Sequence, residues 1–122
     1  MDSRQFERLV AKAIDSLPEE FRERLENVDI VVADWPTPQQ LDSVDKKGRN
    51  SLLGLYEGIP LTRRSQGYGF VMPDKISIFQ KPIEAVCRTD RQIITEIQRV
   101  VRHEIAHHFG ISDERLDELG RY

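Results

Sequence analysis

The segment HEIAHHFGISD spans residues 103–113 and lies near the end of the chain. His103 and His107 are four residues apart, so in a helix they lie one turn apart on one side, and both imidazoles can reach the same point. Glu104 directly follows the first histidine and therefore flanks the pair. The segment predicts a helix that presents two imidazoles and a carboxylate together.

Gly110 and Asp113 follow at intervals of three residues after His107. Glycine is the usual residue just past a helix end, because the turn there takes positive φ and reverses the chain direction. Such a turn can bring Asp113 back over the histidines. Two neutral imidazoles and one carboxylate leave a fourth position for water, which is expected of catalytic rather than structural zinc. Glu104 would then be the base that takes a proton from this water.

Several side chains near the motif have competing interpretations. Glu114 and Asp117 remain open as alternatives for the third ligand, and Asp113 itself could simply favour the N-terminus of a last short helix that begins at Ser112. His108 projects into the middle of the apolar stripe of its helix, so we expect a core histidine bonded to backbone rather than a ligand. Glu96 lies two turns earlier on the histidine flank and could at most support a ligand.

Length and composition limit the number of domains, the partners and the location that we expect. A chain of 122 residues with 39% apolar and 32% charged residues predicts one domain over residues 1–122. Its formal net charge of −3 gives no electrostatic reason to expect nucleic acid or an anionic membrane as a partner. The first residues form no apolar leader, and no run could span a membrane. Cys87 has no second cysteine to pair with, so we expect a small, partly buried residue in a cytoplasmic protein.

Apolar periodicity predicts the helices. A stripe between Ser3 and Ser16 indicates an amphipathic helix, and Pro18 opens a second, short helix with Phe21 and Leu25 facing inward. A long helix begins at Thr89 or Asp90 and runs through the motif to Phe109. The inward stripe of this long helix comprises Ile93, Ile94, Ile97, Val100, Val101 and Ile105.

Shorter patterns predict the strands. The β-branched run at residues 28–33 indicates a buried strand, residues 52–56 a possible second one, and residues 37–40 a capped helical turn between them. Residues 75–81 alternate with period two between two prolines, which indicates a strand at the edge of a sheet. We therefore expect an α+β fold with a small mixed sheet and an edge strand over the motif helix.

The motif resembles the extended zinc motif of the metzincin-type peptidases, with Asp113 where most of those enzymes have a third histidine. More closely, the whole chain resembles a small bacterial family of predicted zinc proteases called minimal metalloprotease-like, or zincin-like, proteins. This likeness covers the N-terminal helices, the strand that follows them, residues 52–56, residues 72–76 with their strand, and the motif helix.

The resemblance implies a compact zincin-like fold, one Zn²⁺ per chain held by His103, His107 and Asp113, and Glu104 as the catalytic residue. The chain differs from metzincins after the third ligand, where those enzymes carry a methionine turn. Only nine residues follow Asp113 here and none is methionine. We therefore expect a site that is open on that side.

The leading hypothesis is a zinc-dependent peptidase, with an extended peptide or protein substrate lying antiparallel along the edge at residues 75–81. The open side of the site motivates a second hypothesis, a non-catalytic or latent zinc-containing protein that binds peptides or regulates a partner. Hydrolysis of RNA ranks last, because the acidic balance disfavours a phosphate backbone. The oligomeric state is open, and so is the residue that stabilises the carbonyl oxygen, with these candidates: Tyr56, Arg63, Arg64, Tyr68 and Tyr122.

Overall fold

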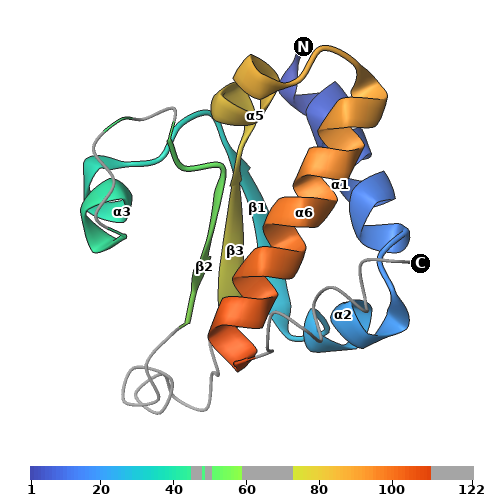
Figure 1. Cartoon of the computed structure of the whole chain (residues 1–122), viewed down its shortest axis with the longest axis vertical. Coiled ribbons are helices and arrows are strands. Elements are labelled where there is room, and N and C mark those ends of the chain that lie inside the picture. Colours follow the sequence, from blue (N-terminus) through green and yellow to red (C-terminus); the bar gives the residue numbers. More distant parts are fainter. Residues whose placement is uncertain (45–47, 49–50, 59–72, 111–122) are drawn as a thin grey trace.

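The computed structural model describes residues 1–44, 48, 51–58 and 73–110. Figure 1 shows α1 and α6 side by side over one face of a small sheet, with α3 beyond β2. The described elements, in chain order, are α1 (Ser3–Asp15), α2 (Glu19–Arg24), β1 (Val28–Ala33), α3 (Pro38–Ser43), β2 (Gly54–Glu57), β3 (Asp74–Phe79), α5 (Gln80–Val86) and α6 (Asp90–Phe109).

The two N-terminal helices form where the periodicity predicts them. Asp2 caps α1, because its carboxylate accepts a hydrogen bond of 2.8 Å from the Gln5 N–H. Pro18 directly precedes α2 and is its N-cap. The apolar stripe of α1 is buried, and so are Phe21 and Leu25 of the second helical segment. Both predicted helices are confirmed.

The described strands form a mixed sheet with the order β1-β3-β2. β1 runs parallel to β3 and pairs Ile30 with Ile76, while β2 runs antiparallel to β3 and pairs Tyr56 with the same Ile76. This row of side chains packs in the core cluster that includes the buried stripes of α1 and α6. The expected α+β architecture with a small mixed sheet is confirmed.

The strand predicted at residues 75–81 lies at the centre of the sheet, so its assignment to an edge is wrong. It ends at Phe79, and residues 76–79 are all buried. The flanking prolines do not prevent this position, because Pro73 precedes the strand and Pro82 stands in the first turn of α5, where no helical N–H bond is lost. The edge strand that contacts the motif helix is β2.

The strand at residues 28–33 forms as predicted, but it lies at the other edge and is not buried. Its side chains alternate between half-buried and exposed, and Val31 keeps 39% of its area exposed. Ile30 and Val32 pack against the core on the helix-covered face. A β-branched run fits a half-buried pleated surface as well as a buried one, so composition alone did not distinguish them.

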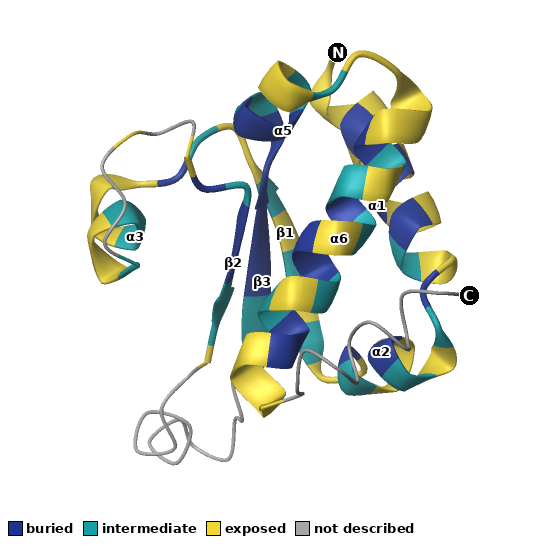
Figure 2. Cartoon of the chain, viewed as in Figure 1, coloured by how far each residue is buried: buried dark blue, intermediate teal, exposed yellow. Residues whose placement is uncertain are grey.

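The motif helix is α6. Thr89 rather than Asp90 is its N-cap, because the Thr89 hydroxyl accepts a hydrogen bond of 3.1 Å from the Gln92 N–H. In Figure 2 the buried residues concentrate on β3 and on stripes of α1 and α6. The helix ends before Gly110, whose φ of 67° lies in the left-handed region. The predicted helix and its glycine stop are confirmed.

The sheet face opposite α6 is partly covered by α3. Thr37 and Gln40 form a capping box, with each side chain accepting from the other residue's backbone N–H at 2.9–3.1 Å. The predicted capped turn is therefore confirmed, and it begins a helix. Leu41 and Val44 then pack on a second apolar cluster made of Leu52, Leu55 and Phe79.

Two further expectations concern single segments. Cys87 is partly buried against the core, as expected, and this burial raises the pKa of its thiol, with the nearby Glu96 carboxylate adding to the shift. The short helix predicted from Ser112 lies outside the described residues. None of the helices that the structure describes is long and apolar enough to cross a membrane.

We predict that Gly54→Ala destabilises the fold, because Gly54 allows β2 to approach α6 closely. A methyl group there would overlap Val100 Cγ1 and come within 3.1 Å of the Ser77 carbonyl oxygen. Overpacking of this kind costs about 1–3 kcal/mol, which urea unfolding measures as a lower free energy of unfolding. Gly48→Ala is the matched control, since a methyl group there meets no described atom within 4 Å. Equal losses in the two variants would contradict this account.

Candidate functional site

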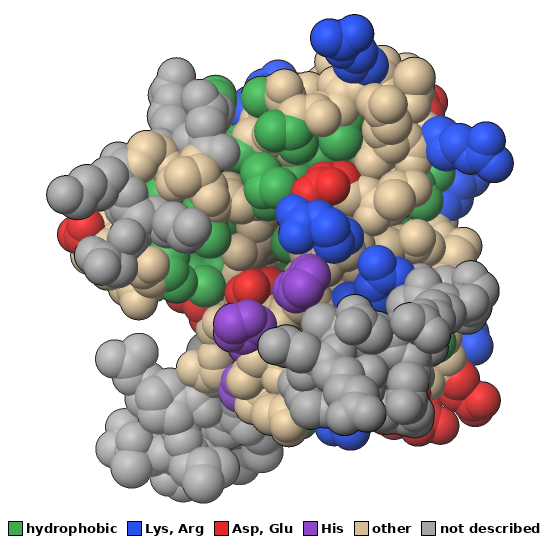
Figure 3. All heavy atoms as spheres, in the orientation of Figure 1, with side chains coloured by type: hydrophobic (Ala, Val, Ile, Leu, Met, Phe, Trp, Pro, Cys, Tyr) green, Lys and Arg blue, Asp and Glu red, His purple; other side chains and the backbone are tan. Residues whose placement is uncertain are grey.

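The motif residues occupy the last two turns of α6, beside β2. His103 and His107 are exposed, and Glu104 is half-buried. His107 is close enough to His103 to lower its pKa. Figure 3 shows the histidine side chains gathered on one face, next to acidic side chains and a hydrophobic patch. The two imidazoles expected from the four-residue spacing thus share one side of the helix, with Glu104 at their flank.

The Glu104 carboxylate is anchored to the outer edge of β2. Its Oε1 accepts a hydrogen bond of 2.8 Å from the backbone N–H of Tyr56. The direction of this N–H follows from the strand ladder, because the Leu53 carbonyl accepts from the Phe79 N–H at 3.0 Å. Alternate residues of the segment therefore turn toward β3, while Gly54 and Tyr56 turn their backbone groups outward. Glu104 thus satisfies a donor at the sheet edge.

His108 does not lie in the core, so that expectation is wrong. Its ring stacks on the Tyr56 ring, with centroids 3.9 Å apart and planes inclined by 18°. Its side chain keeps 37% of its area exposed, and its Nε2 lies 3.8 Å from Asp74 Oδ2. The physical reason is that the last turn of α6 reaches the end of the sheet, where β3 begins at Asp74. The stripe that is buried in the preceding turns of α6 therefore faces only the ends of the strands in this last turn.

Tyr56 links the sheet to the end of α6. Its hydroxyl donates a hydrogen bond of 2.7 Å to Asp74 Oδ2. Because this bond uses the hydroxyl proton, Tyr56 is a weaker candidate for stabilising the substrate carbonyl oxygen. Its ring also meets the Phe109 ring edge-on at 6.1 Å, and the Arg24 guanidinium carbon lies 4.9 Å from the Phe109 ring centroid. Sequence reasoning missed Asp74 and this cluster, because they depend on the strand register.

A pocket of about 470 Å³ runs along the outer edge of β2. Its apolar side is lined by Val44, Leu52 and Leu55, and its polar side by Glu104, His107 and His108, with Tyr56 between them. The motif side chains and an apolar recess therefore share one cavity. The recess could not be predicted from sequence, since it forms only when α3 packs on the far face of the sheet.

The pKa of His103 is lowered from its ordinary value of 6.5. Partial burial is the largest cause, and the positive charges of Arg99, His107 and Arg102 add to it, while Glu104 opposes the shift. A lowered pKa keeps the imidazole neutral at pH 7. The neutral form is the one that binds a metal ion.

Asp113, the proposed third ligand, lies outside the described residues, and so do its alternatives Glu114 and Asp117. Within the part of the chain that the structure describes, no three His, Cys, Asp or Glu side chains gather as a metal-binding group. The two imidazoles on α6 nevertheless fit zinc, because they supply two of its usual nitrogen ligands. Glu96 instead accepts a hydrogen bond of 2.9 Å from Arg99 Nε. Four of the residues considered for stabilising the substrate carbonyl oxygen also lie outside the described residues: Arg63, Arg64, Tyr68 and Tyr122.

Comparison with known protein families gives one match. The matching family model is described as zincin-like metallopeptidase and covers residues 25–121 of the chain. This span contains the described strands and α6, and it includes the entire motif segment, whereas α1 and α2 precede it. A search of the curated proteins gives no match.

We predict that His103 makes the metal-free protein less stable as the solution becomes acidic. Because its folded-state pKa lies below 6.5, the unfolded chain binds more protons at this residue once the pH falls through 6.5, and the free energy of unfolding decreases down to the folded-state pKa. Above that window the residue has no effect on stability. An NMR titration should give a midpoint below 6.5 for His103.

Urea unfolding at a series of pH values checks the same prediction. His103→Gln should lose less stability with acid than the wild type does, because glutamine does not titrate. A titration midpoint at or above the ordinary histidine value would show that the burial argument is wrong.

Proposed function

The chain belongs to the zincin-like metallopeptidase family, and on this basis we propose that it is a zinc-dependent peptidase that prefers an apolar side chain near the scissile bond. The observation that carries the proposal is the hydrogen bond that holds Glu104 at the edge of β2, beside His103 and His107. A carboxylate on a solvated helix face would bond to water instead of accepting a hydrogen bond from the strand edge.

Each motif side chain has a proposed role. His103 and His107 would hold zinc from one side of α6, and Asp113 is the proposed third ligand. When bound, zinc supplies a Lewis acid that polarises the scissile carbonyl and acidifies a water molecule. Glu104 takes the proton from this water and returns it to the leaving amine.

The Tyr56 N–H determines which Glu104 oxygen carries this proton. Oε1 already accepts the Tyr56 hydrogen bond of 2.8 Å, so a proton there would compete with the backbone donor. Oε2 has no hydrogen-bond partner among the described residues and is the better acceptor. The backbone contact therefore orients the carboxylate and leaves one oxygen for the reaction.

The proposed substrate path differs from the one expected from sequence. Residues 75–81 cannot pair with a peptide, because β3 is paired on both sides. We propose that an extended peptide instead lies along the outer edge of β2, where Gly54 turns its N–H and C=O outward beside the Tyr56 N–H that Glu104 holds. One of its side chains would enter the recess formed by Val44, Leu52 and Leu55. Burying a leucine-sized side chain there contributes about 1.5–3 kcal/mol, which favours apolar residues.

We predict that Glu104→Gln keeps its fold and its zinc but hydrolyses peptides about 10²–10⁴-fold more slowly, as expected for the loss of a general base. Glutamine retains an oxygen that can accept the Tyr56 hydrogen bond, so the variant isolates the proton-transfer role. The measurement is cleavage of a broad peptide library by zinc-loaded protein, followed by mass spectrometry, which also reports the apolar preference.

Two outcomes of this assay oppose the proposal. Full hydrolysis by Glu104→Gln would exclude the residue as the base. A zinc-loaded wild type that cleaves no peptide would instead support the alternative function, a non-catalytic or latent peptide-binding or regulatory protein.

We predict about one zinc per chain, bound by three side chains, with zinc lost in both His103→Ala and Asp113→Ala. Metal content after dialysis against metal-free buffer measures this. His108→Ala is the matched control, because its ring stacks on Tyr56, and it should retain zinc. If Asp113→Ala keeps zinc while Glu114→Ala or Asp117→Ala loses it, the third ligand is one of those carboxylates. A wild type that holds no supplied zinc would overturn the site.

A further inference from the structure

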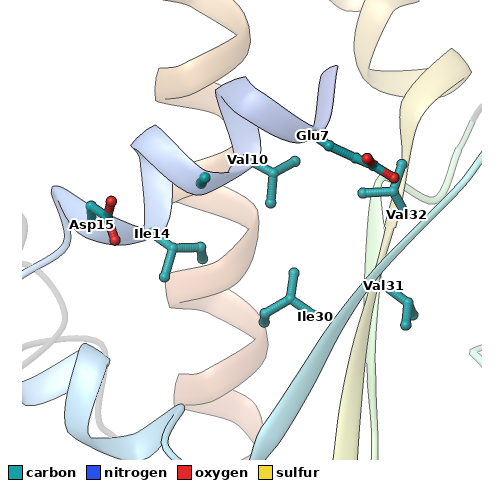
Figure 4. A pocket seen from close by; sticks show the side chains of 8 residues that line it. Glu7, Val10, Ile14, Asp15, Ile30, Val31 and Val32 are labelled. Carbon is teal, nitrogen blue, oxygen red and sulfur yellow. The ribbon is translucent and has the colours of Figure 1, made fainter. Parts of the chain in front are cut away.

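We propose that the groove between α1 and β1 binds an extended segment of a partner protein in which two basic residues flank an apolar one. The groove has a volume of about 570 Å³ and lies at β1, the opposite edge of the sheet from the pocket at β2. In Figure 4 Val10 and Ile14 of α1 and Ile30 of β1 point into the same space, with Glu7 near Val32 and Asp15 toward the other end of α1.

The backbone of β1 offers a pairing edge in this groove. Among the described strands β1 pairs only with β3. The Phe79 N–H donates to the Leu53 carbonyl at 3.0 Å, so the odd-numbered residues of β3 turn toward β2 and its even-numbered residues turn toward β1. In the parallel register that pairs Ile30 with Ile76, these β3 residues bond to the odd-numbered residues of β1. Ile30 and Val32 therefore turn their N–H and C=O groups to the open side, and so does Val28, whose N–H donates to the Leu25 carbonyl at 3.1 Å. A partner strand can bond to these groups.

This edge lacks the features that usually prevent strand pairing. Natural edges are protected by lysine, proline, bulges or a very short strand. β1 contains neither lysine nor proline, its one charged residue is the exposed Asp29 near its start, and its six residues pair with β3 one to one without a bulge. Apolar side chains of α1 line the space beside it. The outer edge of β1 can therefore pair with another strand, and it lies beside an apolar groove that α1 covers.

The charges at the groove select the partner. Among the described residues, Glu7 and Asp15 line it and no basic residue does, while the basic residues Arg8 and Lys12 of α1 line a different pocket. Glu7 and Asp15 are eight residues apart, which is about 12 Å along a helix. An extended chain covers that distance in about four residues. Basic residues four apart on one face of the partner strand would meet the carboxylates, and the residue midway between them would meet the apolar lining.

A second copy of this chain is disfavoured as the occupant. Antiparallel pairing of two β1 strands about a two-fold axis would bring both α1 helices to the same junction. Glu7 and Asp15 of one copy would then lie near the same carboxylates of the other, and like charges at an interface oppose association. A basic strand from a different protein removes this repulsion. The occupant is also distinct from the proposed substrate, which would lie at β2.

The test uses the full chain carrying Glu104→Gln, so that no peptide is cleaved, and two probe peptides. The first is Thr-Lys-Thr-Val-Thr-Lys-Thr, and the second has glutamate in place of both lysines. Amide NMR spectra should show shifts at Ile30 and Val32 with the lysine peptide, which should bind at least about 10-fold more tightly than the glutamate peptide. The double variant Glu7→Lys, Asp15→Lys should reverse this preference.

A backbone variant tests the pairing edge separately. Val32→Pro removes an outward N–H that is not bonded to β3, so the sheet should remain intact while binding of the lysine peptide is lost. If this variant fails to fold, the surface double variant decides alone. Shifts confined to β2 and α6, equal binding of both peptides, or no shifts at all would overturn the proposal. A wild-type dimer that Val32→Pro converts to monomer would also overturn it and assign the edge to a second copy.

Discussion

The hydrogen bond from the Tyr56 N–H to Glu104 Oε1 joins the two parts of the molecule on which the proposed chemistry depends. α6 supplies the motif side chains, and β2 supplies the edge beside them. A hydrogen bond to a charged group contributes about 1.5–3 kcal/mol, and the stacking of Tyr56 on His108 holds the same turn of the helix. The close approach at Gly54 makes both contacts possible. The orientation of the Glu104 carboxylate is thus determined by a strand distant in sequence.

Local patterns in the sequence predicted what local forces determine. The helices predicted within the described residues, the caps at Thr37 and Thr89 and the stop at Gly110 each depend on residues within a few positions of one another, and these form. The position of β3 could not be predicted in this way, because alternation along a strand does not report how many neighbours the strand has. The prediction that His108 lies in the core was wrong for a related reason, since a helical wheel shows the direction of a side chain but not where the sheet beneath the helix ends.

The two edges of the sheet differ in chemistry although both offer backbone groups. The edge at β2 combines imidazoles, a carboxylate and an apolar recess, whereas the edge at β1 combines apolar residues with carboxylates alone. The family match begins at residue 25 and so includes β1 but not α1. The proposed partner groove therefore joins a strand from the matched region to a helix that precedes it.

The direction of α6 has an electrostatic consequence for the site. Its aligned peptide dipoles leave roughly half a negative charge at the C-terminal end, and His107 lies in that last turn. The field there favours cations, so in the proposed reaction it would assist both the capture of a divalent ion and the accumulation of positive charge on a departing amine. The same field disfavours an anion. Negative charge that builds up on a substrate oxygen must therefore be balanced from outside this helix, and a basic or polar group on another segment, or on the substrate itself, becomes a requirement of the design.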